Sequence, residues 1–307
     1  MKTLRGILPA VVTPFDADGR FAPRSFERLL ERLYSAGIDG LYVCGTTGEG
    51  MLQDAAQRKT VVEAAVRGTP PGRQVVVHVG SASTTEAIDL ARHAARAGAH
   101  AVSSVPPLAG SFSFPEVCEY YRTLAAASEL PLVVYYFPEI CPALQRTEDL
   151  QELCALPNVA GVKFTDFDLF KMTSVCRPGQ SVFNGRDEVL AAGLLMGADG
   201  GIGSFYNLLP ERFVELYRLA RTGRWEEARA VQGEINRLIA VVLRFPLFPA
   251  LKQILAWTGI DCGPCLPPRR LLTDEMRKAL ERALAEAGFA ERFALQGRRP
   301  LRSADGG

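Results

Sequence analysis

Lys163 has the setting in this sequence that most strongly indicates chemistry. It lies in the apolar run from Val159 to Asp166, whose composition is typical of a buried strand. Side chains alternate along a strand, so Val162 and Phe164 would face one side and Lys163 the other. A desolvated amine has a lowered pKa and can form an imine with a carbonyl substrate. A structural lysine that reaches solvent or pairs with a carboxylate explains this strand equally well, so both interpretations stay open here.

Tyr135 lies near the end of the preceding apolar run, Leu130 to Pro138. If the two runs are neighbouring barrel strands, their ends lie side by side, and the phenol could approach the amine of Lys163. A phenol can relay protons to an alkoxide or carbinolamine oxygen. The more common role of a strand tyrosine is that of a core aromatic with a satisfied hydroxyl, so Tyr135 alone is a weak indication.

The segment from Cys44 to Gly50 also suits a ligand, because it joins a strand-like run to a helical pattern. Its glycines let the backbone approach a bound molecule closely. Thr46 and Thr47 add hydroxyl and backbone N–H donors, which suit a carboxylate. Small polar residues are also frequent in ordinary strand-to-helix turns.

The elements that must position these residues alternate regularly along the chain. Eight apolar runs are separated by helical patterns, such as the one around 25–33 and one that opens with a capping Thr84 and ends near Gly98. Eight strand–helix units predict an α/β fold of the (β/α)₈ TIM-barrel type, because a doubly wound sheet would open with a Gly-x-Gly-x-x-Gly turn that is missing here. The runs lie near 7–15, 40–45, 74–80, 101–107, 130–138, 159–166, 181–185 and 200–205.

The rest of the chain is predicted to be a helical extension of the barrel. We expect a barrel over 1–223 and a packed helical region over 224–296, with helices near 224–245, 249–258 and 273–288. The last residues, 297–307, have little to bury, which predicts a mobile tail.

Composition excludes several classes of function. The chain of 307 residues has 35 basic and 34 acidic side chains, a balance that argues against nucleic-acid binding. The most apolar long stretch, 238–257, is interrupted by charged residues and prolines, and the N-terminus lacks the pattern of a signal peptide, so neither membrane insertion nor secretion is expected. Seven cysteines, with no histidine placed for a zinc site, fit a reducing cytoplasm.

Four motifs in order resemble the dihydrodipicolinate synthase/N-acetylneuraminate lyase superfamily of pyruvate-dependent Schiff-base aldolases, and the resemblance covers nearly the whole chain. These are Thr13-Pro-Phe15, Gly45-Thr-Thr-Gly-Glu49, Tyr135-x-x-Pro138 and Gly161-Val-Lys-Phe-Thr165. Further segments, at 112–114, 184–188 and 197–207, look like the N-acetylneuraminate lyase branch.

The resemblance implies a role for each matching residue. Lys163 would form the imine with the C2 ketone of a 2-oxo acid and accept electrons as the C3–C4 bond breaks, and Tyr135 would relay protons. Thr46 and Thr47 would bind the substrate carboxylate. The resemblance implies no metal or organic cofactor, and a homo-oligomer, usually a tetramer. The sugar tail would contact Thr165, Gly185, Asp187, Glu188 and Ser204.

Several positions depart from the motifs of that superfamily. The synthases usually have an arginine where this chain has Ile140, which weakens the synthase interpretation. Tyr136 stands where Asn is common, Phe205 replaces a usual Thr, and 108–111 lacks the aromatic pair that normally follows the fourth strand. The reaction type is thus better supported than N-acetylneuraminate itself, and a related aldolase, dehydratase or synthase-like enzyme on another 2-oxo acid is the alternative.

Two further patterns have competing interpretations. Cys262-Gly-Pro-Cys265 has the spacing of a thiol-redox motif, but it lies in the helical extension rather than in a small βαβ domain. His78 would face the barrel interior as a general base or, more commonly, as a hydrogen-bonded core residue. A barrel that binds sugar acids without turnover is the remaining alternative, because of the missing aromatics.

Overall fold

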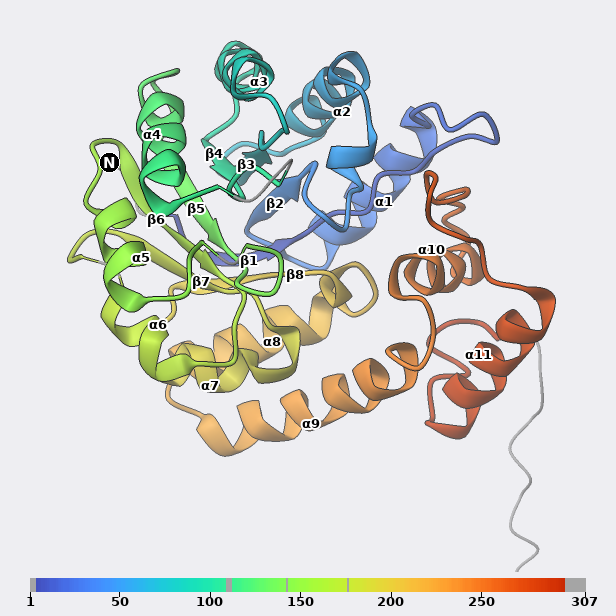
Figure 1. Cartoon of the computed structure of the whole chain (residues 1–307). Coiled ribbons are helices and arrows are strands. Elements are labelled where there is room, and N and C mark those ends of the chain that lie inside the picture. Colours follow the sequence, from blue (N-terminus) through green and yellow to red (C-terminus); the bar gives the residue numbers. More distant parts are fainter. Residues whose placement is uncertain (1–3, 109–111, 142, 176, 296–307) are drawn as a thin grey trace, which may run out of the picture.

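Eight parallel strands form one sheet in the order β1-β8-β7-β6-β5-β4-β3-β2, and an isolated parallel bridge between Ala10 and Tyr42 links its two ends. The computed structural model describes residues 4–108, 112–141, 143–175 and 177–295. The strands are β1 Gly6–Pro9, β2 Gly40–Val43, β3 Gln74–His78, β4 Ala101–Ser104, β5 Leu132–Tyr136, β6 Val159–Phe164, β7 Ser181–Asn184 and β8 Gly200–Gly203. The predicted TIM barrel is therefore confirmed (Figure 1).

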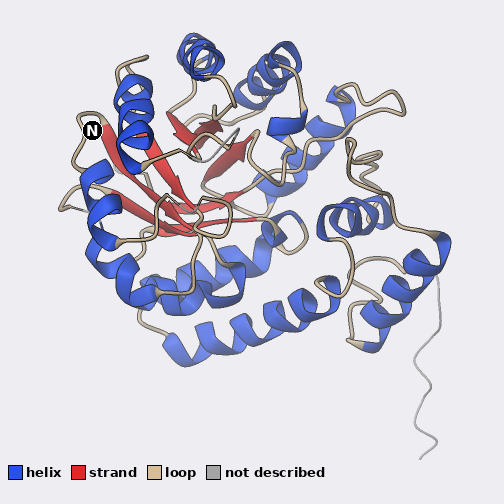
Figure 2. Cartoon of the chain, viewed as in Figure 1, coloured by secondary structure: helices blue, strands red, loops and turns tan. Residues whose placement is uncertain are grey.

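Helices connect successive strands and surround the sheet on the outside (Figure 2). They are α1 Pro23–Ser35, α2 Ala55–Arg67, α3 Thr84–Ala97, α4 Phe114–Ala125, α5 Thr147–Cys154, α6 Leu169–Val175, α7 Leu190–Leu195 and α8 Pro210–Arg221. Short 3₁₀ turns are η1 Gly50–Leu52, η2 Asp187–Val189 and η3 Phe205–Asn207.

The predicted strand runs extend beyond the observed strands at their C-terminal ends. β1 ends at Pro9, whereas the apolar run continues to residue 15, and β4 ends at Ser104, before Pro106 and Pro107. Proline has no N–H to donate to a strand ladder, and the chain must turn towards the next helix at this end of the barrel. The residues beyond each strand therefore form the loops in which a barrel holds its functional groups.

One predicted helix cap is wrong. The N-cap of α3 is Ser83, whose hydroxyl accepts a hydrogen bond from the backbone N–H of Glu86, while Thr84 is already the first helical residue. Both hydroxyl residues can cap a helix, so composition alone could not separate them. The predicted end is correct, because Gly98 adopts the left-handed conformation there with φ 92°.

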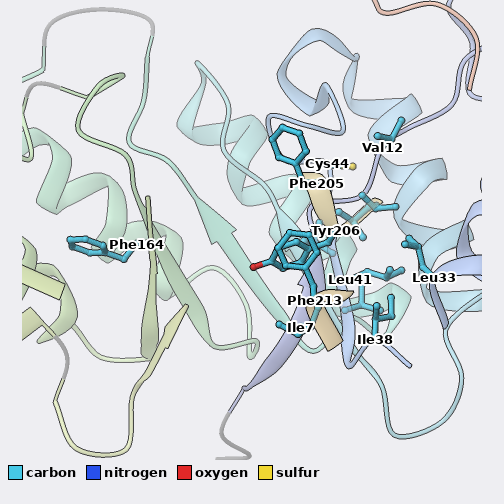
Figure 3. Close-up of a cluster of buried hydrophobic side chains, with 14 of the residues drawn as sticks. Ile7, Val12, Leu33, Ile38, Leu41, Cys44, Phe164, Phe205, Tyr206 and Phe213 are labelled. Carbon is cyan, nitrogen blue, oxygen red and sulfur yellow. The ribbon is translucent and has the colours of Figure 1, made fainter. Parts of the chain in front are cut away.

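Alternation along the strands divides the core into two clusters. Val162 and Phe164 belong to the larger cluster, between barrel and helices, whereas Tyr135 and Phe183 belong to a smaller one inside the barrel. Figure 3 shows part of the outer cluster, in which Phe213 of α8 packs on Tyr206 with 3.9 Å between ring centroids. Burying one such side chain stabilises the fold by roughly 1.5–3 kcal/mol.

Three helices follow the barrel: α9 Trp225–Val242, α10 Leu247–Trp257 and α11 Asp274–Glu286. α9 packs along α8, and α10 contacts η3, next to the eighth strand (Figure 1). No single helix within the described residues has both the length and the hydropathy to cross a bilayer; α9 and α10 meet these criteria only when joined, and they are bent by 111°. The predicted mobile tail, 297–307, lies outside the described residues.

Candidate active site

A cavity of about 180 Å³ opens at the C-terminal ends of the strands. Two larger hollows, of about 420 and 380 Å³, contain neither Lys163 nor Tyr135. All nine residues predicted from the sequence line the smaller cavity together: Thr46, Thr47, Tyr135, Lys163, Thr165, Gly185, Asp187, Glu188 and Ser204. They come from five different strand ends, so the barrel topology is what brings them together.

Lys163 lies in the wall of this cavity and is only 4% exposed. Its Nζ donates to Thr165 Oγ1 over 3.4 Å, and no carboxylate of the described residues forms an ion pair with it. Burial is the main cause that lowers the pKa of Lys163; the nearby Tyr135 and Asp187 oppose this shift. The structural alternatives of a solvent-reaching or carboxylate-paired lysine do not fit this geometry. The lowered pKa shifts Lys163 in the direction of the free amine that imine formation requires.

Tyr135 stands directly beside Lys163, because the two residues are register partners in β5 and β6. The Nζ of Lys163 lies 3.3 Å from the centroid of the Tyr135 ring. Tyr42 packs edge-on against the ring, and Phe137 stacks on it, each with 6.1 Å between centroids. These neighbours hold the phenol next to the amine, as the sequence predicted.

The turn that carries Thr46 and Thr47 is tight and anchored at both ends. Cys44 and Glu49 have left-handed φ angles of 58° and 54°, and a Cβ on Gly50 would lie 1.8 Å from the Cys44 carbonyl oxygen. Thr46 is exposed, whereas Thr47 is buried and its Oγ1 lies 2.6 Å from Ser204 Oγ. The turn thus presents one buried and one open hydroxyl to the cavity.

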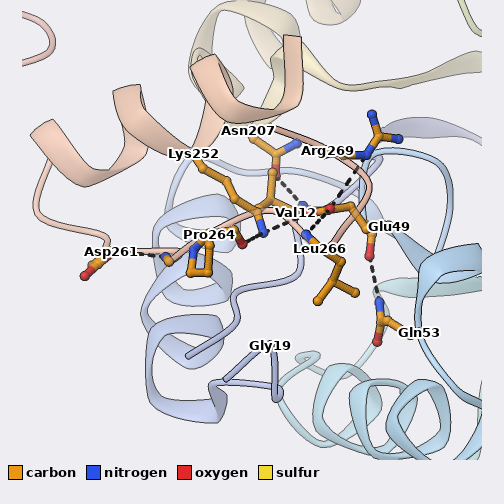
Figure 4. A network of polar contacts seen from close by, with 12 residues as sticks. Val12, Gly19, Glu49, Gln53, Asn207, Lys252, Asp261, Pro264, Leu266 and Arg269 are labelled. Carbon is orange, nitrogen blue, oxygen red and sulfur yellow. Dashed lines mark hydrogen bonds and ion pairs between the residues drawn. The ribbon is translucent and has the colours of Figure 1, made fainter. Parts of the chain in front are cut away.

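A polar network behind this turn connects it to the C-terminal helices (Figure 4). The buried Glu49 carboxylate lies 2.8 Å from Lys252 Nζ and accepts a hydrogen bond from the backbone N–H of Leu266. Lys252 Nζ also donates to the carbonyl of Pro264 over 2.7 Å. The predicted carboxylate-binding turn therefore depends on residues that are distant in the sequence.

Asp187 is buried against the eighth strand. Its Oδ2 accepts a hydrogen bond from the backbone N–H of Phe205 over 2.8 Å. A Cβ on Gly203 would lie 1.6 Å from Oδ1, so only glycine leaves room for this carboxylate. Burial raises the pKa of Asp187 to about 7, although the N–H of Phe205 opposes the shift. Asp187 also opens the 3₁₀ turn η2, and it lines the cavity.

Thr165 and Gly185 lie in close contact across adjacent strand ends. The backbone N–H of Gly185 donates to the carbonyl of Phe164 over 2.7 Å, and a Cβ at position 185 would lie 2.1 Å from Thr165 Oγ1. Glycine at 185 therefore keeps the Thr165 hydroxyl in place beside Lys163.

Sequence reasoning missed several cavity residues. Arg186 stood within the quoted segment 184–188, where a lone basic residue before two acids was the available signal. Tyr42 lies in β2 and Phe137 directly after β5, and the alternation of side chains along each strand was the available signal. Three more belong to the C-terminal helical region, and no local pattern shows that they reach the barrel: Leu243, Leu247 and Phe248.

The residues that depart from the family motifs differ in their position relative to the cavity. Tyr136 faces away from the cavity, where its hydroxyl lies 3.3 Å from Asp166 and 3.1 Å from Lys171 Nζ. Phe205 lines the cavity, and Ile140 packs against the inner core cluster. Residues 109–111 of the segment without aromatics lie outside the described residues.

His78 does not line the cavity. Its Nε2 accepts a hydrogen bond from the backbone N–H of Val105 over 3.2 Å, and its ring packs against Tyr42 and Tyr135. Burial, together with the charges of Arg58 and Lys163, holds the pKa of His78 well below its usual range. These features are typical of a neutral core histidine and do not support a general base.

The Cys262 and Cys265 pair lacks the environment of a redox site. Both thiols are buried, and burial raises the pKa of each to about 12. A redox cysteine needs an accessible thiolate, so the geometry argues against thiol chemistry. No group of three or more His, Cys, Asp or Glu side chains that could hold a metal occurs in the described part of the chain.

Comparisons with known proteins agree with this geometry. The model of the dihydrodipicolinate synthetase family matches residues 3–287. The N-acetylneuraminate lyase of Rhizobium meliloti (strain 1021) is 38% identical over 284 residues, which are 92% of this chain and 95% of that protein. The N-acetylneuraminate lyase of Citrobacter koseri is 37% identical over 295 residues, 95% of this chain and 99% of the relative.

Solved structures are similar over the same extent. CdNal from Clostridium difficile, in complex with mannosamine, has a TM-score of 0.88 and 28% identity, covering 93% of this chain and all of the other. The wild-type sialic acid aldolase of Ruminococcus gnavus also has a TM-score of 0.88, with 26% identity over 94% of this chain and 98% of its own.

Proposed function

Because the chain belongs to the dihydrodipicolinate synthetase family, we propose that it cleaves N-acetylneuraminate to pyruvate and N-acetylmannosamine through an imine on Lys163. The enzyme is a carbon–carbon lyase similar to N-acetylneuraminate lyases. The observation that carries the proposal is the buried Lys163 amine beside the Tyr135 ring, with no ion-pair partner in the part of the chain that the structure describes.

The reaction begins when the neutral amine of Lys163 attacks the C2 ketone of the open-chain sugar acid. Loss of water gives an iminium ion, which accepts the electron pair as the C3–C4 bond breaks. The C4 hydroxyl loses its proton and becomes the aldehyde of the released sugar. The remaining enamine takes a proton at C3, and water then releases pyruvate and regenerates the amine. Tyr135 relays protons in these steps, because its phenol is held next to the amine.

The substrate is held at its two ends by different groups. Thr46 and Thr47 donate hydrogen bonds to the carboxylate at C1. The hydroxyls of the sugar tail contact a second set of cavity residues, whose carboxylates and small polar groups suit vicinal hydroxyls. This set comprises Thr165, Gly185, Asp187, Glu188 and Ser204.

The imine supplies the electron sink, so we propose that no metal or organic cofactor takes part. We also propose that the enzyme is a cytoplasmic homotetramer, which multi-angle light scattering of the purified protein tests for its oligomeric part. A monomeric mass of 33.4 kDa in solution would contradict the tetramer.

Reduction with borohydride in the presence of pyruvate tests the chemistry. We expect one pyruvate-derived adduct, which peptide mass spectrometry locates on Lys163. Lys163→Arg removes the adduct, whereas the matched variant Lys171→Arg, at a lysine that contacts Tyr136 outside the cavity, retains it. Folded wild-type protein without an adduct would overturn the proposal.

A related aldolase or dehydratase acting on a different 2-oxo acid is the second candidate, since Phe205 occupies the cavity where the lyase branch usually has Thr. Comparing kcat/KM for N-acetylneuraminate and 2-keto-3-deoxy sugar acids separates the two. Calorimetric binding of sialic acid without pyruvate release would instead favour a non-catalytic barrel.

A further inference from the structure

Arg186 is a cavity residue for which the proposed reaction has no role. It lies in the loop between β7 and η2, directly before the two acids predicted to bind the sugar tail. The carboxylate at C1 and the ketone at C2 already have partners in the Thr46–Thr47 turn and Lys163. A guanidinium in this wall therefore faces a different part of the bound molecule.

Two aromatic rings hold this guanidinium. Its central carbon lies 5.5 Å from the Phe137 ring centroid and 4.6 Å from that of Phe167. Phe137 in turn stacks on Tyr135, so the position of Arg186 is coupled to the reacting end of the cavity. Rings of this kind fix the faces of a guanidinium while its N–H edges remain available for hydrogen bonds.

The known partner of Arg186 leaves part of its donor capacity unused. One terminal nitrogen pairs with Glu139, whose side chain is 61% exposed, against 17% for Arg186. An ion pair with so exposed a carboxylate adds little stability. The Nε atom of Arg186 is buried and has no hydrogen-bond partner among the described residues. A buried donor without an acceptor costs free energy, so the contacts within the described residues do not satisfy this guanidinium.

We propose that Arg186 determines specificity by binding an anionic group on the sugar tail, so that 2-oxo acids with a second carboxylate are preferred over their neutral counterparts. The planar fork of a guanidinium matches the two oxygens of a carboxylate. Of the neighbouring acids, Asp187 repels such a tail only weakly, because burial raises its pKa to about 7 and leaves it partly protonated near neutrality. This inference rests on the proposed function, whose imine chemistry it uses unchanged.

The condensation of pyruvate with matched aldehydes tests the inference. The pyruvate enamine adds through C3 to the aldehyde carbon, so one C–C bond forms and no other reactant is needed. N-acetylmannosamine and N-acetylmannosaminuronate differ only at C6, a CH₂OH group in the first and a carboxylate in the second. For the wild type we expect kcat/KM to be about 10- to 100-fold higher with the uronate, the range of a charge-assisted hydrogen bond.

Variants of Arg186 and its neighbours test whether the preference for the uronate comes from the guanidinium. Arg186→Gln should remove it, Arg186→Lys should keep only part of it, and Glu139→Gln should keep or increase it. Arg122→Gln, at an exposed arginine on α4 that pairs with Glu119, is the matched control and should keep the wild-type ratio. In the wild type, raising NaCl from about 0.05 to 0.5 M should lower kcat/KM for the uronate only, because salt screens charge–charge attraction.

The outcomes separate this inference from the proposed function. Borohydride trapping with pyruvate is recorded for each protein before its ratio is measured. A wild type that forms the imine but shows no uronate preference, or a preference that survives in Arg186→Gln or is insensitive to salt, overturns the inference alone. A folded wild type that forms no imine overturns both.

Discussion

Glu49 and Lys252 form an ion pair of 2.8 Å in which the glutamate side chain is fully buried and the lysine side chain is 4% exposed. One residue belongs to the turn that carries Thr46 and Thr47, and the other to α10. Lys252 also lies 4.3 Å from the centroid of the Phe15 ring. The pair thus joins the first loops of the barrel to the helical region that follows it (Figure 4).

Removing one charge of this pair should destabilise the protein strongly. Lys252→Met leaves the Glu49 carboxylate buried without its main cation, and we expect the free energy of unfolding to fall by about 3–5 kcal/mol in urea titrations. The double variant Glu49→Gln/Lys252→Met should recover part of this loss. Lys278→Met, at an exposed lysine of α11, should change stability by less than about 0.5 kcal/mol. Equal effects at 252 and 278 would contradict the importance of the buried pair.

Adjacent tyrosines allow a matched test of the proton relay. Tyr135→Phe should lower kcat by about 10²- to 10⁴-fold, because it removes a phenol positioned for proton transfer. Tyr136→Phe should change kcat less than about threefold, since that hydroxyl points away from the cavity towards Asp166 and Lys171. Steady-state assays of pyruvate release measure both. Similar losses in the two variants would argue against a relay through Tyr135.

Gly203 should tolerate no side chain. Gly203→Ala places a Cβ where Asp187 Oδ1 now lies, 1.6 Å away, so the carboxylate must move and we expect at least a tenfold loss of kcat/KM for the sugar acid. Gly233→Ala is the control: it lies within α9, has no heavy atom within 4 Å of its added Cβ, and should stabilise the helix by roughly 0.5–1 kcal/mol. Full activity in Gly203→Ala would show that Asp187 need not stay where it is.

The titration of Asp187 should make stability depend on pH. Its pKa is raised from the ordinary 3.8 to about 7, so the folded state binds this proton more tightly than the unfolded chain does. Stability from this group is therefore full at low pH and falls as pH rises from about 4 to 7. The unfolding free energy of the wild type minus that of Asp187→Asn isolates the effect. This difference should decrease as pH rises over that range. A pH-independent difference would contradict the raised pKa.

Imine formation should also respond to pH. Burial lowers the pKa of Lys163 below the ordinary 10.5, and only the neutral amine attacks the ketone. The initial rate of pyruvate adduct formation should thus rise with pH and level off before pH 10.5. A rate that still rises tenfold per pH unit up to pH 10.5 would indicate an unshifted lysine.

Most of the correct predictions follow from the alternation of side chains along a strand and from the order of strands in a barrel. The period of two places Val162 and Phe164 on the outer face of β6, and the order of strands in a barrel places Tyr135 beside Lys163. Both are properties of local pattern plus topology, so they can be read without a structure. The same reasoning could have assigned the outward face of Tyr136, which alternates with Tyr135.

Contacts between distant segments could not be read in this way. The partner of Glu49 and the cavity residues of the C-terminal helices depend on how α10 packs on the barrel. The choice of Ser83 over Thr84 as a cap depends on the residue at which the backbone changes from extended to helical. No periodicity in the chain encodes these details, because each is decided by three-dimensional packing.

Leu243, Leu247 and Phe248 give the cavity an apolar wall that belongs to a part of the chain without any of the reacting groups. Substitutions in that wall can alter which tail fits while Lys163 and Tyr135 stay untouched. Part of the surface that contacts the substrate tail is thereby encoded in a stretch of the gene separate from the reacting groups. Changes in that stretch leave the residues that form the imine and relay the proton as they are.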